Sequence, residues 1–137
     1  AWSEPLVLEE LTSPWSSYLG VFAQGQTGTQ LIGYGGVKGD LEADLMTIGL
    51  VNGWRGKGLG RRLLQALVDV AADRGVRKLF LEVRESNRRA RKMYQRAGFL
   101  EVGKTPGYYR FPTEAAVTMV RDLKETTGSP GQGRSIP

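Results

Sequence analysis

Apolar and polar positions follow two different periods along this chain, and each period predicts its own kind of element. Residues 17–23 (SYLGVFA) carry the β-branched and aromatic side chains typical of a strand, and residues 30–39 (QLIGYGGVKG) return from it after the turn QGQTGT. The glycines of this return strand indicate a bulge or close packing. Residues 42–51 (EADLMTIGLV) alternate weakly and are then apolar throughout, which predicts a central third strand.

The middle of the chain changes to a helical period. A helix is predicted from Leu59 to the stop at DRG, because apolar residues recur there at three- and four-residue intervals: Leu63, Leu64, Leu67, Val70 and Ala71. Residues 77–84 (RKLFLEVR) predict a buried strand that ends in charge. A second helix is predicted from Asn87 to the stop at Gly98, with one apolar face: Ala90, Met93, Tyr94 and Ala97.

The last elements complete a mixed α/β sheet. Residues 99–110 (FLEVGKTPGYYR) and 115–123 (AAVTMVRDL) predict a strand pair, with Pro106-Gly107 interrupting the first strand. We expect one domain over residues 1–124, and a disordered tail over residues 125–137, which are polar and rich in glycine and proline. Strands before and after two strand–helix units favour the mixed sheet.

Composition narrows the chemistry. The chain has neither cysteine nor histidine, which excludes thiolate nucleophiles, disulfides and histidine bases, so any catalysis must use carboxylates, Tyr, Lys or Ser. No metal site is expected without these two ligands. The lack of cysteine fits a reducing cytoplasm. No segment has the length of a membrane span or the order of a signal peptide, so no membrane partner is expected.

The charge is unevenly distributed. Residues 1–53 hold one base against six acids, a net of −5, whereas residues 54–96 hold thirteen bases against four acids, a net of +9. A basic middle and an acidic front suggest an anionic ligand in one part and a cationic ligand in the other. Solvated helix faces explain a run such as NRRARKMYQRAG equally well. No nucleic-acid motif is present, so direct nucleic-acid binding is not expected.

Three glycines lie between the predicted central strand and the start of the first helix, at positions 56, 58 and 60. Free backbone N–H groups and the helix dipole favour an anion there. Lys57 is followed by Gly58, which excludes a Walker loop, and the spacing of the glycines does not fit the dinucleotide motif Gly-x-Gly-x-x-Gly. A simple tight turn is the alternative interpretation.

The order Arg55-Gly56-Lys57-Gly58-Leu59-Gly60 resembles the pyrophosphate loop of the Gcn5-related N-acetyltransferase (GNAT) superfamily. LEVRESNRRARKMYQRAGF, from residue 81 to 99, is similar to a block of the RimI-type branch, which acetylates the N-terminal alanine of a small-subunit ribosomal protein. WSE at residues 2–4 and GYYR at 107–110 also have counterparts there. The resemblance covers most of residues 2–121. It implies the GNAT fold, here without the N-terminal strand and helix that precede WSE in the family.

The resemblance also implies roles for individual residues. Acetyl-CoA is the implied cosubstrate, and the strand before the loop splays from its neighbour so that its backbone pairs with the pantetheine arm. Glu82 matches the family's general base, which acts through water, and Tyr94 matches its general acid. A strand-end carboxylate paired with Arg84 or Arg55, and a core aromatic, are the plain alternatives. The implied cofactor contacts are Ile48, Leu50, Arg55, Gly56, Lys57, Gly58, Leu59, Gly60, Arg61 and Asn87.

Direct transfer from a thioester to an amine agrees with the missing cysteine and histidine, since it needs no covalent enzyme intermediate. The expected partner is a protein or peptide N-terminus, and Glu42 and Asp44 are candidates to receive a basic peptide. A small-molecule amine acetyltransferase, of the polyamine or aminoglycoside type, would keep the same loop and differ in the segments that face the acceptor. A non-catalytic acyl-CoA sensor would keep the loop but show no turnover, and the presence of both Glu82 and Tyr94 argues against it.

Overall fold

The computed structural model describes residues 6–26, 28–46, 48–50 and 58–123. Their elements follow in the order β1 (Leu6–Thr12), β2 (Ser16–Gly25), β3 (Gly28–Gly39), β4 (Glu42–Leu45), β5 (Gly49–Leu50), α1 (Leu59–Asp73), β6 (Lys78–Arg84), α2 (Arg88–Arg96), β7 (Leu100–Tyr109) and β8 (Glu114–Asp122). None of the helices within these ranges is long and apolar enough to cross a membrane.

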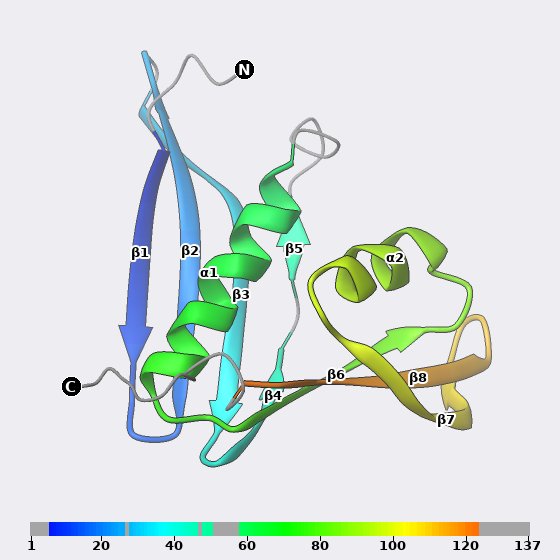
Figure 1. The fold of residues 1–137 in the computed structure, drawn as a ribbon. Coiled ribbons are helices and arrows are strands. Elements are labelled where there is room, and N and C mark those ends of the chain that lie inside the picture. Colours follow the sequence, from blue (N-terminus) through cyan, green and yellow to red (C-terminus); the bar gives the residue numbers. More distant parts are fainter. Residues whose placement is uncertain (1–5, 27, 47, 51–57, 124–137) are drawn as a thin grey trace.

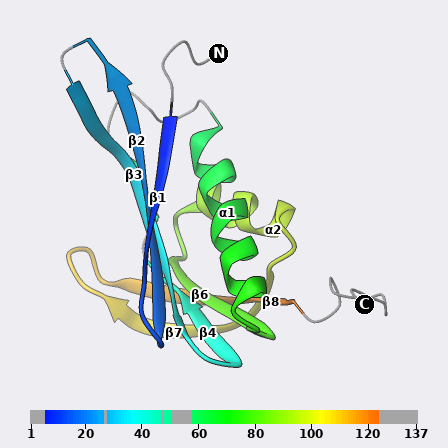
Figure 2. The ribbon, with the colours of Figure 1, turned by 90° about the vertical axis from the view of Figure 1, so that its left-hand side faces the viewer.

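The strands form one mixed sheet in the order β1-β2-β3-β4-β6-β8-β7, with β5 paired to β3 beside this path. Only β4 and β6 pair in parallel, and the other described pairs are antiparallel. The sheet is strongly twisted, so that β6 and β8 run across the direction of β1–β3 (Figure 1). Both helices lie on the same side of the sheet (Figure 2). The mixed α/β sheet predicted from the sequence is confirmed.

The predicted hairpin of β2 and β3 is present, and the glycine-containing strand β3 has both a bulge and a place of close packing. The register shifts between Val21 and Phe22, so β3 contains a bulge. At Gly36 the backbone lies against the ring of Tyr18, where a Cβ atom would come within 2.4 Å of the ring. Any larger residue at position 36 would therefore displace the Tyr18 side chain.

One predicted strand is divided. The sequence indicated a single strand over residues 42–51, and this prediction was wrong, because β4 ends at Leu45 and β5 covers only Gly49 and Leu50. Leu45 pairs with Val37, whereas Gly49 pairs with Tyr34, which leaves one more residue on this strand than on β3 between the two pairs. The extra residue breaks the hydrogen-bonded ladder.

The break opens the sheet at its centre. β4 is paired on both sides, with β3 and, over Glu42–Asp44, with β6. Beyond the break, β5 pairs with β3 alone among the described strands. The strand therefore leaves its β6 neighbour as it approaches α1, which is the splay that the resemblance implied.

The first strand, β1, was not predicted. It pairs with β2 over its whole length as an edge strand. Its sequence, LVLEELT, places two glutamates in the middle of an apolar run, so neither helical nor strand periodicity stands out. One of its leucines, Leu11, is 77% exposed.

Arg74, at the end of α1, closes the turn that follows β1. It donates to the carbonyls of Ser13 and Pro14 at 3.1 and 2.8 Å.

Both predicted helices are confirmed. α1 begins at Leu59 and ends before Gly75, which has a φ of 87°. α2 follows the N-cap Asn87 and ends before Gly98, which has a φ of 95°. Positive φ values favour glycine, so both stops have the physical cause that the sequence indicated. The predicted apolar face of α2 packs partly buried against the core: Ala90, Met93, Tyr94 and Ala97.

The final pair, β7 and β8, is also confirmed. Pro106-Gly107 does not end β7, which runs from Leu100 to Tyr109. Instead, the pairing with β8 shifts register between Thr105 and Tyr109. The predicted disordered tail, and the domain end at residue 124, lie outside the described residues.

Candidate active site

A cleft of about 1180 Å³ lies where the sheet opens, and three parts of the chain form its walls. On one side are the end of β4, β5 and the first turn of α1. On the other are β6 and α2, and the end of β7 contributes Tyr108 and Tyr109. The predicted site residues that line it are Ile48, Leu50, Gly58, Gly60, Arg61, Glu82, Asn87 and Tyr94. Arg55, Gly56 and Lys57 lie outside the described residues.

The N-terminus of α1 offers an anion site to this cleft. Gly58 is its N-cap residue with a φ of 77°, no side chain among the described residues caps the helix, and the first turn has no acidic residue. The first N–H groups are therefore available, and the helix dipole adds to their positive potential. Among the described residues, a Cβ atom at Gly58 would meet only the guanidinium of Arg61, at 3.6 Å, so this side of the backbone is open to a ligand.

Leu59 and Gly60 differ in what they give to the site. The Leu59 side chain is buried in the core and does not line the cleft, so only its backbone N–H could serve a ligand. Gly60 does line it, between Leu50 and Met93: a Cβ atom here would lie 3.5 Å from Leu50 Cδ1 and 3.6 Å from Met93 Sδ. The first turn of α1 thus touches both β5 and α2 at the base of the cleft.

Glu82 projects from β6 into the cleft. It is exposed, and its backbone pairs with Thr118 of β8. Its carboxylate accepts a hydrogen bond from the Tyr108 hydroxyl, and this bond raises the pKa of Tyr108. The proposed structural pairing with Arg84 is not formed, because Arg84 instead forms an ion pair with Glu114 at 3.2 Å.

Tyr94 projects from α2 and lines the same cleft. Its ring packs edge-to-face on Phe99, with centroids 5.9 Å apart, and it is partly buried. This burial raises the pKa of the Tyr94 hydroxyl, with a further contribution from Tyr109. The hydroxyl therefore keeps its proton throughout the neutral and moderately alkaline range. Tyr94 is both the packed aromatic and the cleft-lining phenol that the two interpretations of the sequence described.

Asn87 stands where the sequence predicted the start of the second helix, and the structure gives it a capping role there. As the N-cap of α2, its side-chain oxygen accepts a hydrogen bond from the Ala90 N–H at 3.2 Å. An amide has two further donors on its nitrogen, and Asn87 lines the cleft. It can therefore cap the helix and donate to a ligand at the same time.

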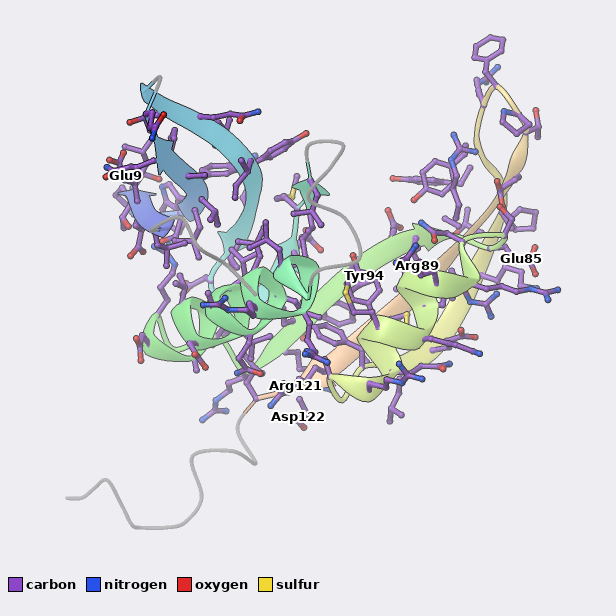
Figure 3. The ribbon with its side chains drawn as sticks, turned by 90° about the horizontal axis from the view of Figure 1, so that it is seen from above. Glu9, Glu85, Arg89, Tyr94, Arg121 and Asp122 are labelled. Atoms are coloured by element: carbon purple, nitrogen blue, oxygen red, sulfur yellow. The ribbon has the colours of Figure 1, made fainter. Side chains whose placement is uncertain are left out.

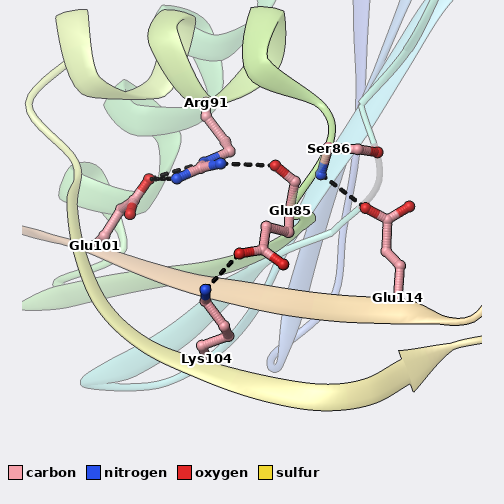
Figure 4. A network of polar contacts seen from close by, with 6 residues as sticks. All are labelled: Glu85, Ser86, Arg91, Glu101, Lys104 and Glu114. Carbon is pink, nitrogen blue, oxygen red and sulfur yellow. Dashed lines mark hydrogen bonds and ion pairs between the residues drawn. The ribbon is translucent and has the colours of Figure 1, made fainter.

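A polar network fixes the turn between β6 and α2 (Figure 4). Arg91 donates to the Glu85 carbonyl at 2.6 Å and to the Glu101 carboxylate at 2.9 Å, and Lys104 forms an ion pair with the Glu85 carboxylate. Glu114 accepts from the Ser86 N–H at 2.7 Å. These contacts hold the start of α2, and with it Asn87 and Tyr94, against β7 and β8.

Sequence reasoning gave no role to several cleft residues. Tyr108 and Tyr109 were noted only as part of the motif GYYR. In the structure Tyr108 contacts Glu82, and the guanidinium carbon of Arg84 lies 4.4 Å from the centroid of the Tyr109 ring. The repeated tyrosine was the available signal. Arg89 and Arg96 also line the cleft, and their position within a long basic run hid them.

A sheet that opens at its centre beside the start of a helix is the arrangement that the resemblance to acyl-CoA-dependent acetyltransferases implied. The sequence profile of the Acetyltransferase (GNAT) family matches residues 1–99. The chain therefore belongs to this family, and it is an acetyl-CoA-dependent N-acetyltransferase. The open backbone at Gly58, the uncapped helix and the absence of acids in its first turn fit the phosphates of that cosubstrate.

Individual relatives agree with the family. The N-alpha-acetyltransferase RimI of Mycobacterium tuberculosis is 37% identical over 126 residues, which cover 88% of this chain and 75% of that protein. A [Ribosomal protein bS18]-alanine N-acetyltransferase of Haemophilus influenzae is 42% identical over 81 residues, 57% of this chain and 55% of the relative. The crystal structure of the ribosomal-protein-S18-alanine N-acetyltransferase of Escherichia coli superposes with a TM-score of 0.68 at 30% identity, covering 87% and 75% of the two chains.

Proposed function

We propose that this protein transfers an acetyl group from acetyl-CoA to the N-terminal α-amine of a protein, and that the acceptor is the N-terminal alanine of a small-subunit ribosomal protein in the cytoplasm. Two relatives named for this acceptor, from Haemophilus influenzae and Escherichia coli, support it. The observation that carries the chemistry is that Glu82 and Tyr94 line one cleft with the anion-binding end of α1.

Glu82 is the proposed general base. Its carboxylate is exposed in the cleft, beside the Tyr108 hydroxyl whose pKa it raises. A water molecule between Glu82 and the acceptor would pass the proton from the amine to the carboxylate. An α-amine has a pKa near ~8, against ~10.4 for a lysine, so a carboxylate acting through water suffices near neutral pH.

Tyr94 is the proposed general acid. The amine nitrogen forms a bond to the acetyl carbon, the carbon–sulfur bond breaks, and the departing thiolate takes the phenolic proton of Tyr94. Its raised pKa keeps the proton in place until the thiolate develops. An exposed N–H on the splayed strand is the proposed donor to the carbonyl oxygen.

The remaining predicted residues are proposed to bind the cosubstrate. The backbone of Ile48 and Leu50, at the open edge of β5, would pair with the pantetheine arm. The amides from Arg55 to Gly60, together with the Arg61 side chain, would hold the pyrophosphate. The free amide donors of Asn87 would complete the contact from α2.

Mass spectrometry of a peptide panel tests the acceptor. Peptides with a free N-terminal alanine, followed by basic or aromatic residues, should gain one acetyl group at the α-amine. Matched peptides with a blocked N-terminus and an internal lysine should show little product, as should polyamines. Equal modification of blocked peptides, or preferred modification of polyamines, would contradict the proposal.

The pH profile of a Glu82→Gln variant tests the base. Turnover should fall near neutral pH and recover in large part at higher pH, where the α-amine is already neutral without help. Glu9→Gln, which removes an exposed carboxylate of β1 outside the cleft, is the control and should keep the wild-type profile. A Glu82→Gln profile with the same shape as the wild type would remove the general-base assignment.

A further inference from the structure

Three arginines line the cleft with side chains that bind no other part of the described chain. Arg61, Arg89 and Arg96 line the cleft, and in the described part of the chain no hydrogen bond or ion pair involves their side chains. Five other cations are bound to oxygen atoms of the protein: Arg74 to carbonyls, Arg84 to Glu114, Arg91 to Glu101, Lys104 to Glu85 and Arg121 to the Ala97 carbonyl. Cations without such a partner also occur outside the cleft, Arg88 and Lys92 among them, so what distinguishes these three arginines is that they share one cleft.

Arg89 and Arg96 lie on either side of Met93, the residue of α2 that is close to the first turn of α1. Met93 lies at the first turn of α1, with Sδ 3.6 Å from where a Cβ atom on Gly60 would be. Arg89 is four residues before Met93 and Arg96 three residues after it, so all three share one face of α2. Figure 3 shows Arg89 and Tyr94 on α2, both on the side that lines the cleft. At ~1.5 Å per residue, Arg89 and Arg96 are about 10 Å apart along the helix.

The chemistry of this face points to phosphate. Guanidinium groups bind phosphate oxygens through paired hydrogen bonds, and unpaired like charges repel one another unless an anion joins them. The acidic residues of the cleft wall, Asp44 and Glu82, belong to β4 and β6 rather than to the helices. The helix face is therefore positive, and it lies beside the anion site of α1 rather than within it.

Coenzyme A carries more phosphate than the end of α1 can hold. Two of its phosphates form the pyrophosphate, which the amides of the α1 end accommodate, and a third is attached to the 3′-oxygen of the ribose. We propose that Arg89 and Arg96 bind this 3′-phosphate and make the enzyme select coenzyme A over its 3′-dephospho form. The proposal rests on the use of acetyl-CoA and is independent of the acceptor.

Calorimetry with coenzyme A and with 3′-dephospho-coenzyme A tests it. The wild type should bind coenzyme A about 10- to 100-fold more tightly than the dephospho form, as expected when a charged hydrogen-bonded pair is lost. An Arg89→Ala/Arg96→Ala double variant should lose this preference: its affinity for coenzyme A should fall to the value for the dephospho form, which should not change. The matched control is Arg88→Ala/Lys92→Ala, which removes the same charge from exposed positions of α2 that do not line the cleft.

The other outcomes overturn the proposal, each for its own reason. Equal loss of affinity for both ligands in the double variant would place the arginines on the pyrophosphate. An equal effect of the control variant would mean that only the general field of the helix matters. A wild type that binds both ligands equally would show no 3′-phosphate site. Because no acceptor is present, an error in the proposed acceptor leaves the result unchanged, whereas failure to bind either ligand would contradict the cosubstrate itself.

Discussion

α1 and α2 lie on the same side of one sheet, yet different forces hold them. α1 buries six side chains in the core, Leu59, Leu63, Leu64, Leu67, Val68 and Ala71. α2 buries none, and its nine residues include five arginines and lysines. Asn87 caps its start, Arg91 ties it to Glu85 and Glu101, and Arg121 donates to the Ala97 carbonyl at its end at 2.8 Å.

The difference separates two tasks. Burial of apolar surface stabilises the fold through α1, whose start presents bare backbone to the cleft. Polar contacts at its ends fix α2, which leaves its long side chains available to the cleft. Changes in α1 beyond its first turn should therefore affect stability, and changes on the cleft face of α2 should affect ligands and chemistry.

The largest expected effect is a loss of turnover when Tyr94 on α2 is changed. Tyr94→Phe keeps the ring on Phe99 and removes the proposed proton donor. Turnover should fall by about 10²- to 10⁴-fold, as is typical when acid–base help is lost, with acetyl-CoA affinity nearly unchanged. Single-turnover kinetics measure this, and Tyr18→Phe, an exposed tyrosine of β2, is the control. Full turnover of Tyr94→Phe, with chemistry shown to limit the rate, would make Tyr94 a packing residue.

The core side of α1 should give the largest effect on stability. Leu67 is fully buried, so Leu67→Ala should lower the free energy of unfolding by about 2–5 kcal/mol through lost burial and the cavity that it leaves. Denaturant unfolding measures this, and the remaining folded protein should keep its turnover. Leu100→Ala is the control: its side chain is 70% exposed, and the change should stay within about 0.5 kcal/mol. A similar loss in both variants would contradict the role of α1.

The two ends of α1 offer a matched pair of glycines. Gly58 and Gly75 have φ values of 77° and 87°, so Gly58→Val and Gly75→Val should both destabilise the fold, by about 1–3 kcal/mol each. Only Gly58 lines the cleft. Calorimetry should show that Gly58→Val, when folded, no longer binds acetyl-CoA and that Gly75→Val does. Unchanged affinity in Gly58→Val would remove the loop from the binding site.

The smallest effects should separate the two tasks of Asn87. Asn87→Ala should cost about 0.5–2 kcal/mol of stability, because the hydrogen bond to the Ala90 N–H is lost. Asn87→Asp keeps that bond but removes the amide donors and adds a negative charge to the cleft. Its stability should match the wild type while its affinity for acetyl-CoA falls. Equal affinity in Asn87→Asp and the wild type would leave Asn87 as a cap alone.

The sequence predicted those elements whose pattern has a local cause. α1 and α2 were placed within a residue of their bounds because apolar spacing, the Asn87 cap and the stops at Gly75 and Gly98 all lie within each segment. The edge strand β1 has no such pattern, since its pairing with β2 rather than its own residues makes it a strand. The break after Leu45 likewise depends on the register against β3, which no single segment contains.

The site divides in the same way. The motifs placed Glu82, Tyr94 and Gly58 in one cleft, although their roles are still predictions. The contact between Glu82 and Tyr108 was not predictable, because Tyr108 lies in the part of β7 where the register against β8 shifts, and this shift depends on the pairing of two strands. The arginines of α2 could be counted from the sequence, but only the fold distinguishes those with partners from those without.

The parallel pairing of β4 with β6 has a mechanical consequence. It covers three residues on each strand, Glu42–Asp44 against Lys78–Phe80, and within the described residues it alone connects the hydrogen bonds of β1–β5 to those of β6–β8. So short a seam resists bending far less than the long ladders on either side of it. A molecule that fills the cleft therefore lies between two halves of the sheet that share only this short ladder.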